Sequence, residues 1–288
     1  MFSITGSDLK IKSKRKAIMR KENVLRRLLK EGKPSLGTHV VTPWPGMFEV
    51  IGNSGVFDYI EYVSEYSTWT LPLFDEIGRT MELFPQMSVM IKIEEQARGM
   101  VATRAIDAGF QSVIFADIRT ADDVRESIRY VRAETPEIGG LHGVNGRRQS
   151  GGYGGVRGGT ATQDWVKSLN EIVVVVMIEK KSAMQNLDEI LSVEGVDMVQ
   201  FGPSDYSISI GKPGQARHPD VQNAEIEMVK RALKKGIQPR VEANDLEEAK
   251  KFMDLGVRHM CIGTDLGTIG DWCKQQTKGG IASLLKSV

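Results

Sequence analysis

The sequence predicts an α/β protein, a (β/α)8 TIM barrel with an N-terminal helical extension, and two observations lead to this prediction. From Pro34 onward, strand-like and helix-like segments alternate, which is typical of parallel βαβ units. Eight strand candidates occur, the number that closes such a barrel, and 288 residues are enough to hold them. An open, doubly wound sheet is the alternative, but no strand candidate is followed by the G-x-G-x-x-G pattern that would favour it.

The strand candidates are short runs rich in apolar and β-branched residues. They span residues 36–41, 59–63, 88–93, 112–116, 172–178, 197–201, 239–242 and 259–262. Helical candidates lie between them, at residues 47–54, 73–84, 98–108, 121–132, 183–191, 221–234 and 246–255. Thr120 and Ser182 are expected as helix N-caps, and Gly109 and Gly256 as C-caps.

Two segments depart from this alternation and define the expected domain organisation. Residues 1–33 are predicted to form a basic N-terminal helical extension, and residues 34–288 a single barrel domain. The extension is interpreted as a helix that caps the barrel floor or contacts another subunit; an arm for nucleic acid is the alternative, but no aromatic residues interleave with its charges. A glycine-rich insertion, residues 139–160, is expected to be an interface or lid, or a disordered insertion.

Composition limits the classes of partner. Lys plus Arg number 38 and Asp plus Glu 37, so no overall charge favours nucleic acid or an acidic membrane. The two cysteines, Cys261 and Cys273, are too few for a disulfide framework, and both are expected to be structural because neither has a histidine nearby in the sequence. No apolar run approaches the roughly 20 residues of a membrane helix. We therefore expect a soluble, cytoplasmic protein that binds neither nucleic acid nor membranes.

Candidate functional residues lie where the strand candidates end, because active sites of this fold are built there. Glu179 ends the most apolar strand candidate, and Asp205 follows the next one after a Gly-Pro turn. Carboxylates at the ends of adjacent parallel strands can share one ion, and such a pair suits Mg²⁺ or Mn²⁺. The other interpretation is an ion pair with Lys92 or Lys180, and the spacing alone leaves both open.

Residues 177–219 read MIEKKSAMQNLDEILSVEGVDMVQFGPSDYSISIGKPGQARHP, and this stretch resembles the core of the HpcH/HpaI aldolase family. The resemblance extends from about Gly37 to Asp265, with GTHVVTPWPGMFEV near its start and HMCIGTDL at its end. It implies a (β/α)8 barrel, assembled as hexamers of domain-swapped dimers that exchange the last helix. It also implies a class II, metal-dependent pyruvate aldolase that acts on 4-hydroxy-2-oxo or 2-keto-3-deoxy acids.

The resemblance implies a role for each matched position. Glu179 and Asp205 match the ligands of a divalent metal, Mg²⁺, Mn²⁺ or Co²⁺. Gly202 and Ser204 match positions whose backbone N–H groups receive the pyruvate carboxylate. Arg147, with Arg148 beside it, lies where the family often carries arginines after its glycine-rich segment; the alternatives are binding of an acidic substrate tail and a solvated charge pair. No organic cofactor is implied.

Two departures from the family pattern bear on catalysis. The family usually ends its second strand with Asp-Gly-Glu-His, in which the histidine is the acid/base, whereas residues 63–66 here read Val-Ser-Glu-Tyr. Lys92 stands where the family has an arginine that polarises the keto group. Lysine keeps the positive charge but loses the bidentate fork of arginine.

The group that transfers the proton is therefore left open. Glu65 and Tyr66 are candidates, although Glu65 could equally form a structural ion pair and Tyr66 an aromatic wall. His142 could reach a site or lie on the surface, and His39 could be a buried or rim residue. Metal-bound hydroxide is a further candidate base. His218 is expected to cap a helix.

The leading hypothesis is a carbon–carbon lyase that releases pyruvate and an aldehyde from a 4-hydroxy-2-oxo acid. Lys92, Glu65 and Tyr66 are its candidate catalytic residues. Another metal-enolate lyase or a decarboxylase is the second hypothesis, and a non-catalytic protein that binds a metal and a 2-oxo acid is the third. A Schiff-base aldolase using Lys92 or Lys180 does not explain the two carboxylates. A homo-oligomer is expected.

Overall fold

A computed structural model describes residues 21–145 and 160–286 of the chain. The predicted substrate-binding residue Arg147, its neighbour Arg148 and most of the glycine-rich insertion lie outside the described residues. The basic residues between Lys10 and Arg20 lie outside them as well, so the nucleic-acid interpretation of that segment stays untested.

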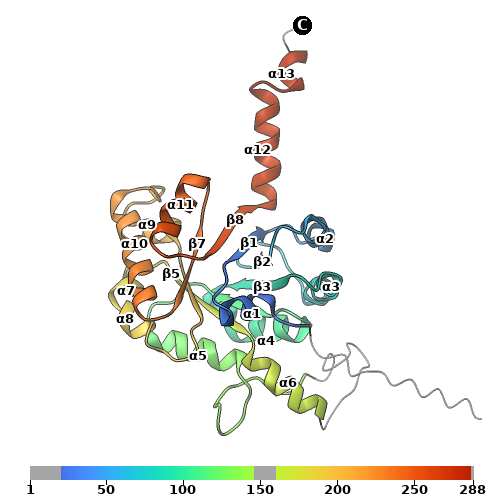
Figure 1. Cartoon of the computed structure of the whole chain (residues 1–288), viewed down its shortest axis with the longest axis vertical. Coiled ribbons are helices and arrows are strands. Elements are labelled where there is room, and N and C mark those ends of the chain that lie inside the picture. Colours follow the sequence, from blue (N-terminus) through green and yellow to red (C-terminus); the bar gives the residue numbers. More distant parts are fainter. Residues whose placement is uncertain (1–20, 146–159, 287–288) are drawn as a thin grey trace, which may run out of the picture.

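Eight parallel strands close into a barrel in chain order, with the last strand paired to the first (Figure 1). This confirms the predicted fold class and excludes an open sheet. Every strand candidate corresponds to one observed strand. The strands are β1 (Ser35–Val40), β2 (Tyr59–Val63), β3 (Ser88–Ile93), β4 (Ser112–Phe115), β5 (Val173–Ile178), β6 (Met198–Phe201), β7 (Gln238–Glu242) and β8 (His259–Thr264).

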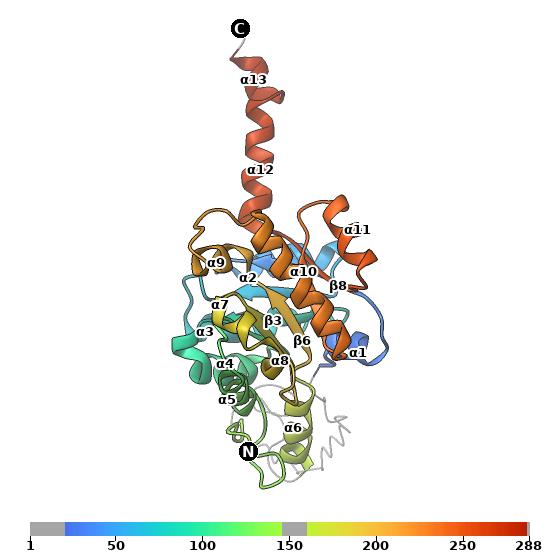
Figure 2. The same cartoon turned by 90° about the vertical axis from the view of Figure 1, so that its left-hand side faces the viewer.

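Helices surround the barrel between consecutive strands (Figure 2). They are α2 (Pro45–Ser54), α3 (Leu71–Met81), α4 (Arg98–Ala108), α5 (Ala121–Val131), α6 (Thr160–Asn170), α7 (Lys181–Gln185), α8 (Leu187–Ile190), α10 (Pro219–Lys234) and α11 (Leu246–Asp254). A 3-10 turn, η1 (Glu95–Ala97), precedes α4, and a short helix, α9 (Pro203–Ser209), follows β6.

The expected caps are largely present. Thr120 caps α5 through a capping box with Asp123, and Gly109 is the C-cap of α4. His218 caps α10, where its Nδ1 accepts a hydrogen bond from the Asp220 amide. Ser182 was wrongly expected as an N-cap, because α7 begins one residue earlier and Lys180 precedes it.

A short helix, α1 (Val24–Lys30), covers the N-terminal end of the barrel. Its N-cap, Asn23, also donates hydrogen bonds to the backbone carbonyls of Gln111 and Glu171, just before β4 and β5. Arg26 forms an ion pair with Asp197, just before β6. The described part of the N-terminal extension thus ties together the starts of three strands.

The apolar core has two parts, one on each side of the sheet. The larger part packs helices onto the outer face of the strands. The smaller part fills the inside of the barrel near the floor and includes Tyr59, Met90 and Val175. Further along the strands, buried polar side chains such as Glu61 and Lys92 take the interior positions. The C-terminal half of the barrel interior is therefore polar.

The last two helices leave the barrel. Figures 1 and 2 both show α12 (Asp265–Thr277) and α13 (Ile281–Leu285) extending away from the C-terminal ends of the strands. Apolar side chains on α12 are exposed, among them Leu266, Ile269 and Trp272, whose exposed fraction is 60%. Within the described ranges, no helix has the length and apolar character needed to cross a membrane.

Candidate active site

A cavity of about 210 Å³ opens at the C-terminal end of the barrel. It is lined by most of the residues that the sequence marked as functional: Tyr66, Lys92, Glu179, Gly202, Ser204 and Asp205. A larger hollow of about 770 Å³ lies at the opposite end, between α1 and α6, and contains none of them. The smaller cavity is therefore the candidate active site.

Glu179 follows β5, whose side chains are all buried, and it is 1% exposed. Its Oε1 accepts a hydrogen bond of 2.6 Å from the Asp117 amide. Its Oε2 is buried and has no hydrogen-bond partner among the described residues. Burial is the main cause that raises the pKa of this carboxyl group. A buried oxygen without a partner lowers the stability of the folded protein unless a cation or a hydrogen-bond donor binds to it.

Gly202 makes room beside that oxygen. A Cβ at this position would lie 2.6 Å from Glu179 Oε2, so any other residue would fill the space next to it. The Gly202 N–H already donates a hydrogen bond of 3.1 Å to the Ile178 carbonyl. The amide of Gly202 is thus engaged in the backbone, and its expected part in binding a carboxylate stays a prediction. Ser204 lies in the first turn of α9 and lines the cavity.

Asp205 lies on α9 and is held by Lys180. The Nζ of Lys180 is 3.0 Å from Asp205 Oδ1 and 2.8 Å from Asp117 Oδ1. Asp117 has a φ of 57°, an uncommon conformation for a residue with a side chain. The ion-pair interpretation from the sequence therefore holds for Asp205 and Lys180. It does not describe Glu179 Oε2, for which residues 21–145 and 160–286 contain no ion-pair partner.

Lys92 forms a close ion pair with Glu65, at 2.6 Å from Nζ to Oε2. Burial works to lower the pKa of Lys92, but the charge of Glu65 and other nearby groups outweighs it and raises the pKa overall. Lys92 is therefore a fixed positive charge in the cavity wall. This contact is the ion pair that one interpretation of Glu65 expected, and the catalytic interpretation of Glu65 stays a prediction.

Tyr66 stands at the mouth of the cavity, with the Nζ of Lys92 4.9 Å from its ring centre. The residue is 63% exposed as a whole. Burial is the largest cause that raises the pKa of its hydroxyl to about 12. A phenol with this pKa is protonated at neutral pH, so it can donate a proton but is a poor base.

Comparisons with known proteins bear on the family of the chain. A family model described as HpcH/HpaI aldolase/citrate lyase matches residues 76–270. The chain belongs to this family. A solved structure, the HpcH/HpaI aldolase from Desulfitobacterium hafniense, is similar with a TM-score of 0.75 and 24% identity, covering 89% of this chain and 96% of that one.

Two relatives of the family carry names that state an activity. The hydroxypyruvate/pyruvate aldolase of Paraburkholderia phytofirmans is 32% identical over 167 residues, which cover 57% of this chain and 61% of that protein. The 4-hydroxy-2-oxo-heptane-1,7-dioate aldolase of Escherichia coli is 26% identical over 245 residues, which cover 85% of this chain and 89% of that protein. These names support the expected carbon–carbon lyase.

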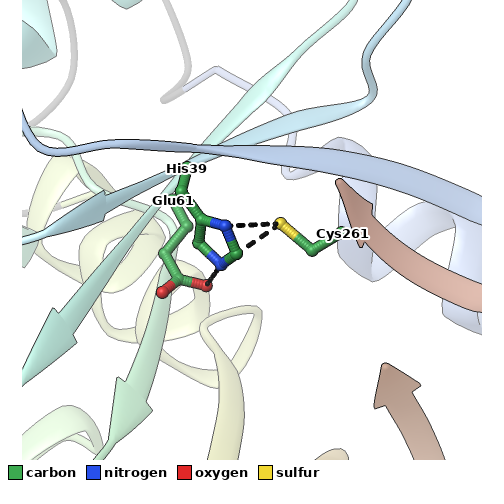
Figure 3. Close-up of side chains that lie close together, drawn as sticks. All are labelled: His39, Glu61 and Cys261. Carbon is green, nitrogen blue, oxygen red and sulfur yellow. Dashed lines mark hydrogen bonds and ion pairs between the residues drawn. The ribbon is translucent and has the colours of Figure 1, made fainter. Parts of the chain in front are cut away.

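This member of the HpcH/HpaI family also contains a polar cluster inside the barrel that sequence reasoning did not assemble. His39 on β1 lies beside Glu61 on β2 and Cys261 on β8 (Figure 3). Burial disfavours the charged form of His39, but Cys261 and Glu61 outweigh this effect and raise its pKa. Arg240, fully buried on β7, forms an ion pair with Glu61. Charged residues within the strand candidates were the signal in the sequence that could have revealed this cluster.

Two further expectations are corrected. Cys261 was expected to lack an activating histidine, yet its Sγ lies 3.4 Å from His39 Nε2. His142 was expected on the surface or within reach of a site, yet it is 3% exposed. It lies 3.3 Å from Asp107 and packs against Trp165, away from the cavity. His142 is thus a structural residue.

Proposed function

We propose that this protein is a divalent-metal-dependent aldolase that cleaves a 4-hydroxy-2-oxo acid into pyruvate and an aldehyde. The observation that carries the proposal is the buried Oε2 of Glu179, which has no hydrogen-bond partner among the described residues and faces the space left by Gly202. Asp205 lines the same cavity and supplies a second carboxylate. Oxygen ligands of this kind fit Mg²⁺ or Mn²⁺.

Glu179 and Asp205 would hold the cation, and the ion pair between Lys180 and Asp205 would orient the second carboxylate. When bound, the cation supplies Lewis-acid polarisation of the 2-oxo group and stabilises the negative charge that develops as the C–C bond breaks. The two proposed ligands of the cation thus come from the ends of neighbouring strands, as the sequence predicted.

The chain's own residues would bind and orient the substrate around that position. Lys92, fixed by Glu65, places a positive charge where the 2-oxo acid would lie and helps to polarise its keto oxygen. The amide of Ser204, in the first turn of α9, would donate to the substrate carboxylate. In cleavage, the 4-hydroxyl loses a proton while the C3–C4 bonding electrons move to C3, and C3 then accepts a proton.

Tyr66 is the donor that this arrangement offers for the last step, because its hydroxyl stays protonated at neutral pH. The base that takes the 4-hydroxyl proton is left unassigned. This departs from the family pattern, in which one histidine performs both transfers. We expect methyl-proton exchange of pyruvate, which needs no aldehyde, to be the simplest sign of this chemistry.

The test follows exchange of the pyruvate methyl protons in D₂O by NMR, after EDTA treatment and titration with Mg²⁺, Mn²⁺ or Co²⁺. Exchange that needs a metal and is lost in Glu179→Gln supports the proposal. The matched control is Glu189→Gln, an exposed glutamate on α8, which should exchange like the wild type. Metal-dependent binding of pyruvate without exchange would overturn it and favour another 2-oxo acid or a binding role.

A further inference from the structure

Three potential metal-binding side chains meet inside the barrel, apart from the Glu179 and Asp205 pair. His39, Glu61 and Cys261 come from β1, β2 and β8, and each is buried (Figure 3). One ligand atom from each, a nitrogen, an oxygen and a sulfur, lies within 4.8 Å of the other two. His39 and Glu61 are paired across adjacent strands, so both side chains point into the barrel.

The two separations measured from His39 are those of ligands around a single ion. The Nε2 of His39 is 3.4 Å from Cys261 Sγ and 3.6 Å from Glu61 Oε2. Zinc binds nitrogen and oxygen at about 2.0–2.2 Å and sulfur at about 2.3 Å in a tetrahedron, which places neighbouring ligand atoms roughly 3.3–3.6 Å apart. The distances from His39 Nε2 to Cys261 Sγ and to Glu61 Oε2 therefore match those between neighbouring ligand atoms of a zinc ion.

The imidazole is also oriented as metal ligands are. Its Nδ1 lies 3.0 Å from the Gly263 carbonyl, which can only accept, so Nδ1 carries a proton and Nε2 faces the cluster. A bulge in β8 produces this contact, because the pairs Gly37–Cys261 and His39–Thr264 leave one extra residue on β8. Gly263 has a φ of 63°, which glycine adopts without strain.

Glu61 is held in place by Arg240. The residue is 1% exposed, and its Oε2 is in contact with Arg240 Nη2. The guanidinium is itself fixed, because its Nε donates a hydrogen bond to the Tyr59 hydroxyl and its Nη1 donates one to the Gln200 side chain. A carboxylate oxygen has two lone pairs, so Oε2 can contact the guanidinium and a cation together. The guanidinium thus fixes the carboxylate beside His39, as second partners fix the carboxylate ligands of metals.

We propose that His39, Glu61 and Cys261 form a second metal site, which binds Zn²⁺. Imidazole and thiolate ligands favour zinc, whereas Mg²⁺ takes oxygen ligands almost exclusively. The Glu179 and Asp205 pair offers only carboxylates, so the two sites differ in the ions that they prefer. Both sites border the same cavity, since His39 and Glu61 are among the residues that line it.

The groups around His39 can balance the charge of a zinc ion. They are Glu61, Glu242 and Cys261, and Arg240 forms an ion pair with Glu61. Zinc ligation requires a thiolate and a neutral imidazole. With the Cys261 thiolate and the Glu61 carboxylate bound, the charge of Zn²⁺ is neutralised within its own ligand set.

The experiment uses Co²⁺ as a spectroscopic probe on the full-length, metal-stripped protein. Thiolate ligation gives a near-ultraviolet charge-transfer band, and the wild type should develop it as Co²⁺ is added. Cys261→Ala should lose the band, whereas Cys273→Ala, at the exposed cysteine on α12, should keep it. His39→Gln and Glu61→Gln should weaken Co²⁺ binding at least tenfold, measured by the same titration.

Glu179→Gln separates this proposal from the proposed function. It should abolish pyruvate exchange and leave the band intact, so either proposal can fail alone. Extended X-ray absorption of the Zn²⁺ form should show one sulfur at about 2.3 Å. The inference is overturned if the wild type gives no band, if the band survives in folded Cys261→Ala, or if His39→Gln and Glu61→Gln both bind Co²⁺ as the wild type does.

Discussion

At position 202 the side chain is a single hydrogen atom, and this determines what surrounds Glu179. A Cβ at this position would lie 2.6 Å from Glu179 Oε2 and within the space that we assign to the cation. We expect Gly202→Ala to weaken Mn²⁺ binding roughly tenfold or more, which is about 1.4 kcal/mol per factor of ten. Isothermal titration of the metal-free protein measures this.

The matched control is Gly270→Ala on α12, where a Cβ would meet no atom within 4 Å. It should bind Mn²⁺ like the wild type. Equal affinity in both variants would mean that the space beside Glu179 Oε2 is not used by the cation, and would contradict the assignment.

Residues that stand out in their own stretch of sequence were easier to predict than residues whose role depends on a distant partner. Glu179 stands out because a carboxylate ends an apolar strand, and Glu65 was recognised as a candidate ion-pair former. The pairing of His39 with Cys261 was not predictable in this way. The two residues lie near opposite ends of the chain and meet only because closure of the barrel brings β8 beside β1.

At the scale of elements, the seam between β1 and β8 contains a buried histidine that responds to pH. His259 begins β8, is 2% exposed, and its Nδ1 lies 2.9 Å from the Ser35 hydroxyl at the start of β1. Burial lowers the pKa of His259 to about 4. The unfolded chain takes up a proton there near pH 6.5, whereas the folded chain does not until pH falls to about 4.

The free energy of unfolding should therefore contain a contribution from His259 that is present above about pH 6.5 and is lost as pH falls towards 4. Urea unfolding of the wild type and His259→Gln at several pH values measures it. The variant should lose stability less steeply across this window. Because burial also raises the pKa of Glu225 to about 7, only the difference between the two proteins is informative. Parallel curves would refute the prediction.

The strands were predicted more completely than the helices. Most of the strands are buried runs of mainly apolar residues, so composition locates them. The helices α6 and α9 were missed for local reasons: α6 begins at the end of the glycine-rich insertion, and α9 lies within the Gly-Pro-Ser-Asp segment of a loop. Tertiary contacts, which the sequence does not display, stabilise such short or interrupted helices.

At the scale of the molecule, the helix α12 presents apolar side chains that nothing in the described chain covers. Ile269 and Trp272 are 51% and 60% exposed on a helix that extends away from the barrel. We propose that it packs against a second copy, as the resemblance to swapped dimers implied. If each of two copies packs its α12 against the other copy, the apolar side chains of both α12 helices are covered. The product is a dimer, or a hexamer built from such dimers.

The double variant Ile269→Lys with Trp272→Lys should therefore shift the protein from an oligomer to a monomer in sedimentation velocity experiments. Leu83→Lys, at an apolar residue of the barrel surface that is 64% exposed, is the control and should keep the oligomer. A wild-type protein that sediments as a monomer, or a double variant with the wild-type mass, would refute the exchange.

The helix α1 at the barrel floor has a consequence for biosynthesis. It emerges from the ribosome before any strand, yet its Asn23 and Arg26 bind backbone and side-chain groups as distant as Glu171 and Asp197. These partners are synthesised much later, after β4 has left the exit tunnel. The helix that precedes every strand in the chain is thus among the last elements to find its place, and the floor closes only when more than half of the 288 residues have emerged.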